Sequence, residues 1–449
     1  MTGLPPASVS EPAPPGVDSA PADAREFALR RRAALQGKTL EIVTQVGLIT
    51  LLPRLLGPAP FGRLMLAIAV VTVGTALISL GAPSAFARFL PAEPPERRSA
   101  VARAMTLRLL KVRAGQLALA AVLGLLLLLS VPERVTPLDL ALVYVALVLE
   151  VAAMLAAQIA LGMGRTWIWS FRLVARNIGF LVAVPVLFAI TGPVGVLLGV
   201  VVGAAVGAAF AGVAIRGLVR HTGSRADIPP GSDRYGIITG LSAVLSQLTY
   251  RGPVLAAALL AGSAVETGYA GLAGGIAMAA MFAVREIFTV SLPELVERWD
   301  RDRAQARHVL DRIGWRAEWV LIAGALAGAL MLERALPLVA GESYAGAVGA
   351  LLPVLALLPL LPAAAVAAQM AALALKPERA FAMYAVGLVA FAATAVWLVP
   401  AWGARGASLA LLVAVAVSGG VAAVIFPEAV KPRLLVLGLA GAAAVLRVG

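Results

Sequence analysis

The sequence is poor in residues that build metal centres or carry out covalent catalysis. Its 449 residues include no cysteine and only two histidines, His221 and His308, both in expected loops. The lack of cysteine excludes disulfide bonds, thiolate metal sites and cysteine nucleophiles, and two separate loop histidines do not make a metal site. We therefore expect neither a metal nor a cofactor.

Charge is scarce as well. Asp, Glu, Lys and Arg make up 14% of the chain, whereas a soluble domain has about a quarter. Hydrophobic residues make up 61%, and the mean hydropathy is +0.92. They gather in blocks of 18 to 28 residues with few charges, which as helices can cross a bilayer core of about 30 Å. Since backbone groups in lipid must bond within their own segment, these blocks predict membrane-spanning helices.

The fold class expected is therefore all-α, a polytopic membrane protein with about twelve transmembrane helices. A shorter apolar segment, 433–447, is either a thirteenth span or a re-entrant stub. Residues 1–24 are rich in Pro, Ala and Ser without an apolar run, which indicates a disordered tail and not a signal peptide. The twelve expected spans are 39–57, 61–88, 113–131, 137–161, 167–190, 193–219, 235–261, 265–291, 315–336, 345–374, 379–400 and 404–426.

The distribution of Lys and Arg predicts the orientation. With the N terminus in the cytoplasm, the expected inside segments contain 27 Lys and Arg residues and the outside segments five. Cytoplasmic loops of membrane proteins carry such an excess. We therefore expect a multi-pass protein of the inner (plasma) membrane with a cytoplasmic N terminus. The net charge of +13 then reflects these loops, and no nucleic-acid partner is expected.

An internal repeat divides the chain into two halves. Arg165 and Lys376 each close an Ala- and Leu-rich span and are 211 residues apart, and Gly195 and Gly406 open apolar helices at the same offset. Two six-helix halves of like orientation are related by an axis along the membrane normal, and a cleft between them can open to either side. The expected parts are a cytoplasmic tail (1–37), two bundles (38–219 and 234–426), the linker 220–233 and a C-terminal segment (427–449).

Four short motifs occur in a consistent order along residues 35–426. They are Leu55–Gly62, Leu80–Phe89, Leu292–Leu295 and Gly341–Ala345, which read LLGPAPFG, LGAPSAFARF, LPEL and GESYA. Together they resemble the polysaccharide (O-antigen type) flippases of the multidrug/oligosaccharidyl-lipid/polysaccharide exporter superfamily. The resemblance implies a V-shaped pair of bundles that moves lipid-linked sugars from the inner to the outer leaflet. The long tail and the weak thirteenth segment depart from the family pattern.

Four arginines lie more than one helical turn inside expected spans, where ionisable groups are costly and usually face a cavity or a partner. Guanidinium groups bind phosphate oxygens bidentately and keep their charge. We therefore expect these arginines to line the cleft and to bind the pyrophosphate of a lipid-linked sugar. The alternative is structural: Arg176 could pair with Glu150, and Arg172 could extend to the headgroups. The four arginines are Arg172, Arg176, Arg251 and Arg285.

Two glutamates are candidates for coupling transport to a proton or cation gradient. Glu150 shares a helix face with Met154 and Gln158, and Glu41 lies near the inner end of the first span. A buried carboxylate suits proton exchange. The alternative is that Glu41 pairs with Lys38 and Glu150 with Arg176.

The basic segment 299–316 is expected to lie in the inner headgroup layer as a surface helix. The leading function is a flippase for a lipid-linked oligosaccharide, with membrane lipids, a polysaccharide polymerase and glycosyltransferases as partners. Alternatives are a multidrug exporter of the same superfamily and a scaffold in an envelope-synthesis complex. An enzyme is not expected, because the sequence has no Asp-x-Asp pair, no His-rich loop and no large outside loop.

Overall fold

A computed structural model describes residues 20–91, 93–130, 136–216, 226–374 and 376–449. The part it describes is all-helical, as expected. The helices of the first half are α1 (Ala20–Leu56), α2 (Pro58–Ser79), α3 (Ala82–Phe89), α4 (Pro95–Ser130), α5 (Pro137–Gly162), α6 (Thr166–Thr191) and α7 (Pro193–Ala214). Those of the second half are α8 (Ser232–Ala256), η1 (Ala257–Ala261), α9 (Ala264–Arg301), α10 (Arg303–Ala340), η2 (Glu342–Ala347), α11 (Val348–Leu357), η3 (Leu358–Leu360), α12 (Leu361–Leu373), α13 (Pro377–Ile425) and α14 (Pro432–Val448).

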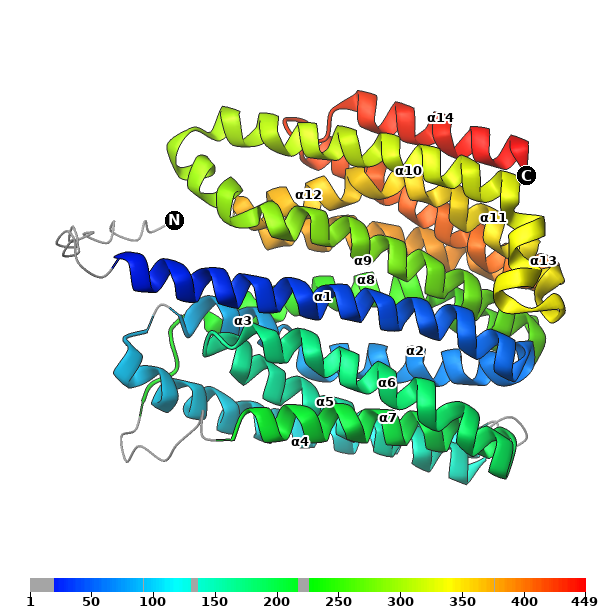
Figure 1. Ribbon diagram of the computed structural model, residues 1–449, viewed down its shortest axis with the longest axis horizontal. Coiled ribbons are helices and arrows are strands. Elements are labelled where there is room, and N and C mark those ends of the chain that lie inside the picture. The colour runs from blue at the N-terminus through cyan, green and yellow to red at the C-terminus, as the bar shows by residue number, and fades with distance from the viewer. Residues whose placement is uncertain (1–19, 92, 131–135, 217–225, 375) are drawn as a thin grey trace.

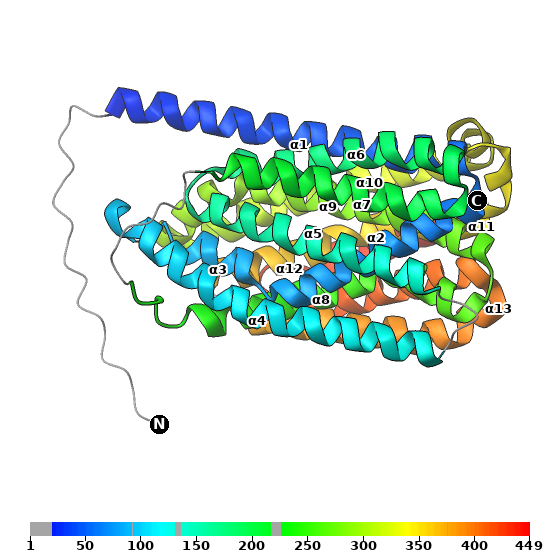
Figure 2. The ribbon, with the colours of Figure 1, turned by 90° about the horizontal axis from the view of Figure 1, so that it is seen from below.

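The long helices run roughly parallel to one axis, and successive ones reverse direction (Figure 1). Seen at right angles, α1 lies along one side of the molecule and α4 along the other (Figure 2). Eleven described segments are long and apolar enough to cross a membrane. One of them, α13, contains two expected spans, because Gly403 interrupts the helix with φ 53° and ψ −131°. Every expected span therefore corresponds to a helical segment of the structure.

The second expected span, 61–88, is broken into α2 and α3. The break lies at Leu80, with φ 27°, and Gly81, with φ 68°. Gly81 also lies against the backbone of α8, where a Cβ atom would come within 1.7 Å of the Gly236 carbonyl oxygen. A glycine is required here both for the left-handed conformation and for the close approach.

The expectation of a separate surface helix at 299–316 is wrong. Helix α9 continues to Arg301, and α10 starts at Arg303 and runs without interruption to Ala340. Asp302 caps α10, since its carboxylate accepts hydrogen bonds from the Ala304 and Gln305 amides. The basic segment is thus the junction of two long antiparallel helices (Figure 1). Its amphipathic pattern reflects packing of the first turns of α10 and not a helix in the membrane plane.

The two ends of the chain also differ in detail from the expectation. Helix α1 begins at Ala20, inside the expected tail 1–37, while residues 1–19 lie outside the described residues. At the other end, α14 packs along α10 and α11, and Gly449, which follows it, lies beside Leu352 in the middle of α11. Asp311 on α10 holds the first residues of α14 through ion pairs with Lys431 and Arg433.

Candidate functional site

The centre of the site is an ion-paired group formed by α5 and α6. Glu150 on α5 accepts hydrogen bonds from Arg172 Nη1 at 3.0 Å and from Arg176 Nη1 at 3.2 Å. The side chains of Glu150 and Arg172 are 6% and 3% exposed, and that of Arg176 is 18% exposed. The pairing of Glu150 with Arg176, the structural alternative, is confirmed, and Arg172 joins the same pair. Arg172 therefore does not extend to the headgroups.

Helix α6 is held in place by a row of glycines on α7. Four glycines spaced four residues apart lie on one face of α7 and meet α6. Cβ atoms at the first three would collide with atoms of α6, and a Cβ atom at Gly207 would lie 3.1 Å from the Arg176 Cβ. Small residues allow close helix approach in membranes. On its other side, α6 is tied to α1 by a hydrogen bond from Asn177 to Thr44. The four glycines are Gly195, Gly199, Gly203 and Gly207.

Arg251 reaches the same region from α8, in the other half of the chain. It is 8% exposed and lies within electrostatic range of Arg176. No described acidic side chain pairs with it, and its Nε is buried without a protein partner. The next residue, Gly252, packs against the Phe391 ring of α13, so Arg251 is positioned by a tight contact between α8 and α13. Pro253 lies in the last turn of α8, and a π turn, η1, follows.

We call Glu150, Arg172, Arg176 and Arg251 the central arginine cluster. The cluster combines three guanidinium groups with one carboxylate, so it carries a net charge of about +2 at neutral pH. The Nε atoms of all three arginines are buried without a protein partner. Since an unsatisfied buried donor costs about 1–3 kcal/mol, the cluster is suited to bind an anion.

The other two expected site residues lie outside this cluster. Arg285 on α9 is exposed and lies within electrostatic range of Tyr384 on α13. Glu41 on α1 pairs with Lys38 at 3.0 Å, which confirms the structural alternative for that residue. Glu41 is also within electrostatic range of Arg172. The structure thus brings together three of the four expected arginines and one of the two glutamates.

The sequence reasoning missed several buried ionisable residues, among them Arg113 and Glu318. Arg113 on α4 is 2% exposed and donates from Nη2 to Gln158 on α5 at 2.7 Å. Glu318 on α10 is 1% exposed, and neither carboxylate oxygen has a side-chain partner. Both lie at the edge of an expected basic loop, where charged residues are common and therefore do not indicate burial. Only the continuation of α4 and α10 through those segments shows that they are buried.

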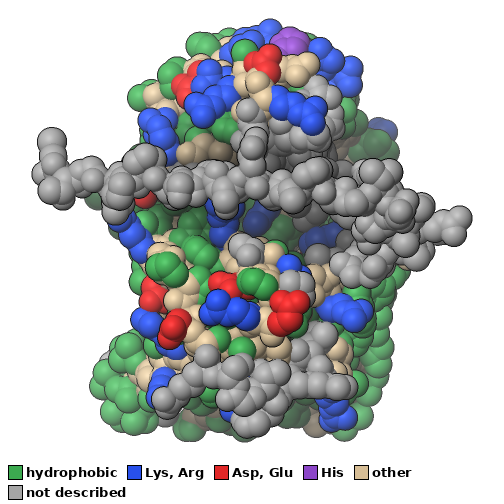
Figure 3. Space-filling model, turned by 90° about the vertical axis from the view of Figure 1, so that its left-hand side faces the viewer, with side chains coloured by type: hydrophobic (Ala, Val, Ile, Leu, Met, Phe, Trp, Pro, Cys, Tyr) green, Lys and Arg blue, Asp and Glu red, His purple; other side chains and the backbone are tan. Residues whose placement is uncertain are grey.

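The end of the molecule where α1 begins is rich in positive charge. Figure 3 looks onto this end, and Lys and Arg side chains lie on both its upper and its lower part. The turns between α5 and α6 and between α12 and α13, which contain Arg165 and Lys376, belong to this end. Among the described residues, no group of three or more His, Cys, Asp or Glu side chains could hold a metal ion.

Comparison with known structures shows the fold of flippases and multidrug transporters. The chain is similar to the lipid II flippase MurJ in an inward closed conformation, with a TM-score of 0.64, 11% identity, and 94% of this chain and 98% of that chain covered. It is similar to an outward-facing multidrug resistance MATE family transporter of the MOP superfamily, with a TM-score of 0.55, 15% identity, and 91% and 96% covered. It is also similar to the Vibrio cholerae MATE transporter VcmN in the bent form, with a TM-score of 0.54, 15% identity, and 91% and 98% covered.

No curated protein matches the chain significantly. The family model described as polysaccharide biosynthesis protein matches residues 37–299, more than half of the chain. This match and the shared fold confirm the resemblance to polysaccharide flippases that the four motifs indicated. The chain is a multi-pass membrane protein that belongs to the polysaccharide biosynthesis protein family, with the fold of MOP-superfamily transporters.

Proposed function

We propose that the protein is a flippase that moves a polyprenyl-pyrophosphate-linked oligosaccharide from the inner to the outer leaflet for cell-surface polysaccharide synthesis. The observation that supports this most directly is the central arginine cluster, a buried group with excess positive charge contributed by both halves of the chain. A pyrophosphate is a dianion or more highly charged, and arginine is the side chain best suited to bind it bidentately. The family match supports a role in polysaccharide synthesis.

The cluster also supports a transport mechanism. Arg172 and Arg176 are on α6 and Arg251 is on α8, so an anion bound among them contacts both expected bundles, 38–219 and 234–426. We propose that its binding offsets the repulsion between Arg176 and Arg251 and allows the bundles to rearrange around the site by alternating access. Arg285 belongs to the proposed site as a more exposed cation on α9.

A multidrug exporter is the less favoured alternative. A cavity for cationic drugs requires acidic groups that attract them. Glu150, the acidic residue of the cluster, already pairs with two arginines. The cluster therefore favours an anionic substrate.

The proposed orientation places the N terminus and the basic end of the molecule in the cytoplasm, in the inner membrane. The substrate then enters from the leaflet where lipid-linked sugars are assembled. Glycosyltransferases that build the sugar would act before the flippase, and a polysaccharide polymerase after it.

Replacement of Arg251 by Ala tests the function. Loss of a charge-assisted hydrogen bond of about 1.5–3 kcal/mol weakens anion binding about 10- to 100-fold. We therefore expect surface polysaccharide to fall at least tenfold in cells whose sole copy is Arg251→Ala or Arg176→Ala, with normal membrane insertion. Arg251→Lys keeps the charge without the bidentate geometry and should retain part of the activity.

Arg334→Ala is a matched control, because Arg334 is an exposed arginine on α10 outside the cluster. It should leave export unchanged. Full export by both Arg251→Ala and Arg176→Ala, at normal protein levels, would refute the site.

A further inference from the structure

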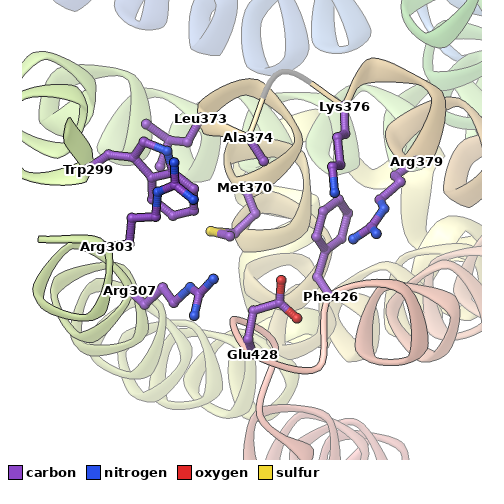
Figure 4. Close-up of a pocket in the computed structure, with 10 residues that line it drawn as sticks. All are labelled: Trp299, Arg303, Arg307, Met370, Leu373, Ala374, Lys376, Arg379, Phe426 and Glu428. Carbon is purple, nitrogen blue, oxygen red and sulfur yellow. The ribbon is translucent and has the colours of Figure 1, made fainter. Parts of the chain in front are cut away.

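A basic cavity lies away from the central arginine cluster, at the positively charged end of the molecule. It has a volume of about 360 Å³ and is formed by α9, α10, α12, α13 and the turn before α14 (Figure 4). Four of its lining side chains are cationic and one is acidic. The lining residues are Trp299, Arg303, Arg307, Met370, Leu373, Ala374, Lys376, Arg379, Phe426 and Glu428.

One wall is an aromatic ring that carries two guanidinium groups. Arg303 and Arg307 lie one helical turn apart at the start of α10, and the centre of each guanidinium is 5.6 Å from the centroid of the Trp299 ring. Cation–π contact orients these groups before any ligand binds. The Nε of Arg307 is buried without a protein partner. A partly buried guanidinium with an unused donor at a cavity is prepared to bind an acceptor.

The opposite wall, at the start of α13, repeats this arrangement. The Arg379 guanidinium lies 5.3 Å from the Phe426 ring centroid and donates to the Ile425 carbonyl oxygen at 3.0 Å. Figure 4 shows Lys376 and Arg379 across the cavity from Arg303 and Arg307. Met370 and Leu373 of α12 also line the cavity and are buried. The cationic groups of the two walls thus line one cavity together with apolar side chains.

The charge balance of this lining favours an anion. Four cations share the cavity with Glu428 as the one carboxylate among the lining residues, so like charges repel across it. Phosphate oxygens are the natural partners of arginine and lysine, and basic pockets between transmembrane helices bind phosphorylated headgroups. The volume is at the lower end of the range for ligand sites, about 300–1,000 Å³, which fits a small phosphate group and not an oligosaccharide.

We propose that this cavity binds a phosphate group that bridges α10 and α13, carried either by an anionic phospholipid or by a small phosphate compound from solution. The bound group neutralises the repulsion between the two walls. It thereby holds the α9–α10 junction against the start of α13. The site uses no residue of the central arginine cluster, so this proposal can be tested independently of the proposed substrate site.

Binding measurements on the purified full-length protein in nanodiscs separate the two sources. In phosphatidylcholine nanodiscs, titration with inorganic phosphate and with pyrophosphate tests the soluble source. Replacement of part of the lipid by phosphatidylglycerol, without phosphate in the buffer, tests the lipid source. The readouts are the change in melting temperature and, for lipid, retention of phosphatidylglycerol in native mass spectrometry. We expect saturable stabilisation in at least one arm.

Three variants determine whether this cavity is responsible. Arg307→Gln combined with Lys376→Gln should weaken binding at least tenfold, about the effect of one charged hydrogen bond. Glu428→Gln removes the opposing charge and should tighten binding about threefold, as expected for an exposed charge. Arg312→Gln removes one positive charge from α10, as Arg307→Gln does, at an exposed position outside the cavity, and should bind like the parent protein.

The outcomes are decisive in both directions. Absence of saturable stabilisation in both arms would overturn the proposal. An equal loss of binding in Arg312→Gln and in the double variant would show a general effect of surface charge. Weaker binding by Glu428→Gln would show that this carboxylate does not oppose the ligand. Either result would also overturn the proposal. Melting curves recorded without ligand identify variants that lose binding because they fail to fold.

Discussion

Glu150 sets the charge of the central arginine cluster. It accepts hydrogen bonds from both Arg172 and Arg176, so its protonation would raise the charge of the cluster by one and release two guanidinium groups. An anionic substrate and a proton at this position would therefore influence each other. This linkage is the physical basis on which Glu150 remains a candidate for coupling transport to a gradient.

Replacement of Glu150 by Gln tests that coupling. Gln keeps the shape and one acceptor but cannot take up a proton, so we expect transport by Glu150→Gln to lose its dependence on an imposed pH gradient. Loss of one partner of a buried ion pair also costs about 3–5 kcal/mol, which a lower melting temperature would reveal. The measurement is translocation in proteoliposomes with and without the gradient.

Glu41→Gln is the companion variant, because Glu41 pairs with Lys38 outside the cluster. If Glu150→Gln keeps the pH dependence of the parent protein, Glu150 is a structural partner of the two arginines. If Glu41→Gln alone abolishes it, the coupling residue is Glu41.

At the residue scale, the sequence predicted three arginines of the cluster and, as an alternative, the pair of Glu150 with Arg176. It predicted neither that Arg172 joins this pair nor that Arg285 is exposed. Arg172 and Arg176 are four residues apart, so a shared helix face followed from spacing alone. Their joint pairing with Glu150 depends on the rotation of α5 relative to α6, which spacing within one helix does not define. Arg251 was predicted as a site residue because charged groups inside a membrane span are costly and usually have a function. Glu318 and Arg113 were missed because they lie at the ends of apolar blocks.

At the scale of the element, the length of the apolar segments predicted the transmembrane helices well, since a helix needs a minimum number of consecutive apolar residues to cross the bilayer core. The break between α2 and α3 was not predicted, because it depends on the contact of Gly81 with α8. Similarly, the extension of α10 at the basic end of the molecule is polar, and hydropathy alone cannot distinguish a polar helix extension from a loop. Helix ends outside the bilayer therefore remained the least predictable part of the fold.

The glycines of α7 provide a test at this scale. A Cβ atom at Gly199 would lie 2.6 Å from the Val184 Cα of α6, a backbone atom that cannot move aside. We expect Gly199→Ala to force α6 and α7 apart at a cost of about 1–3 kcal/mol, measured as a lower melting temperature of the purified protein. The displacement of α6 should also weaken transport, because α6 carries Arg172 and Arg176.

Gly212→Ala is the control on the same helix. A Cβ atom there meets nothing within 4 Å, and Ala favours helix over Gly by about 0.5–1 kcal/mol. Gly212→Ala should therefore leave the melting temperature unchanged or raise it. Equal melting temperatures for the two variants would show that the close packing of α6 on α7 does not contribute to stability.

At the scale of the whole molecule, the two halves of the chain touch near both ends of the bundle. Near the basic end, Gly81 meets Gly240 of α8, where a Cβ atom would lie 2.2 Å from the Gly81 nitrogen. Near the other end, Gly268 of α9 meets Pro58, and a Cβ atom at Gly268 would lie 2.0 Å from the Pro58 carbonyl oxygen. Alternating access requires that such contacts open one at a time.

A cysteine cross-link tests whether the contact at the basic end must open. A Cβ atom built at Gly236 lies 3.5 Å from the Ala85 Cβ, within the range of about 3.5–4.5 Å that a disulfide requires. The chain has no cysteine of its own, so Ala85→Cys with Gly236→Cys forms the one possible intramolecular bond. We expect oxidation of this variant to reduce transport at least tenfold, and a reductant to restore it.

The control is Ala363→Cys with Gly419→Cys, a pair within the second half whose Cβ separation is 3.8 Å and whose oxidation should leave transport intact. Continued transport by the fully oxidised first pair would show that the halves do not separate at this end, and alternating access between these bundles would have to be abandoned.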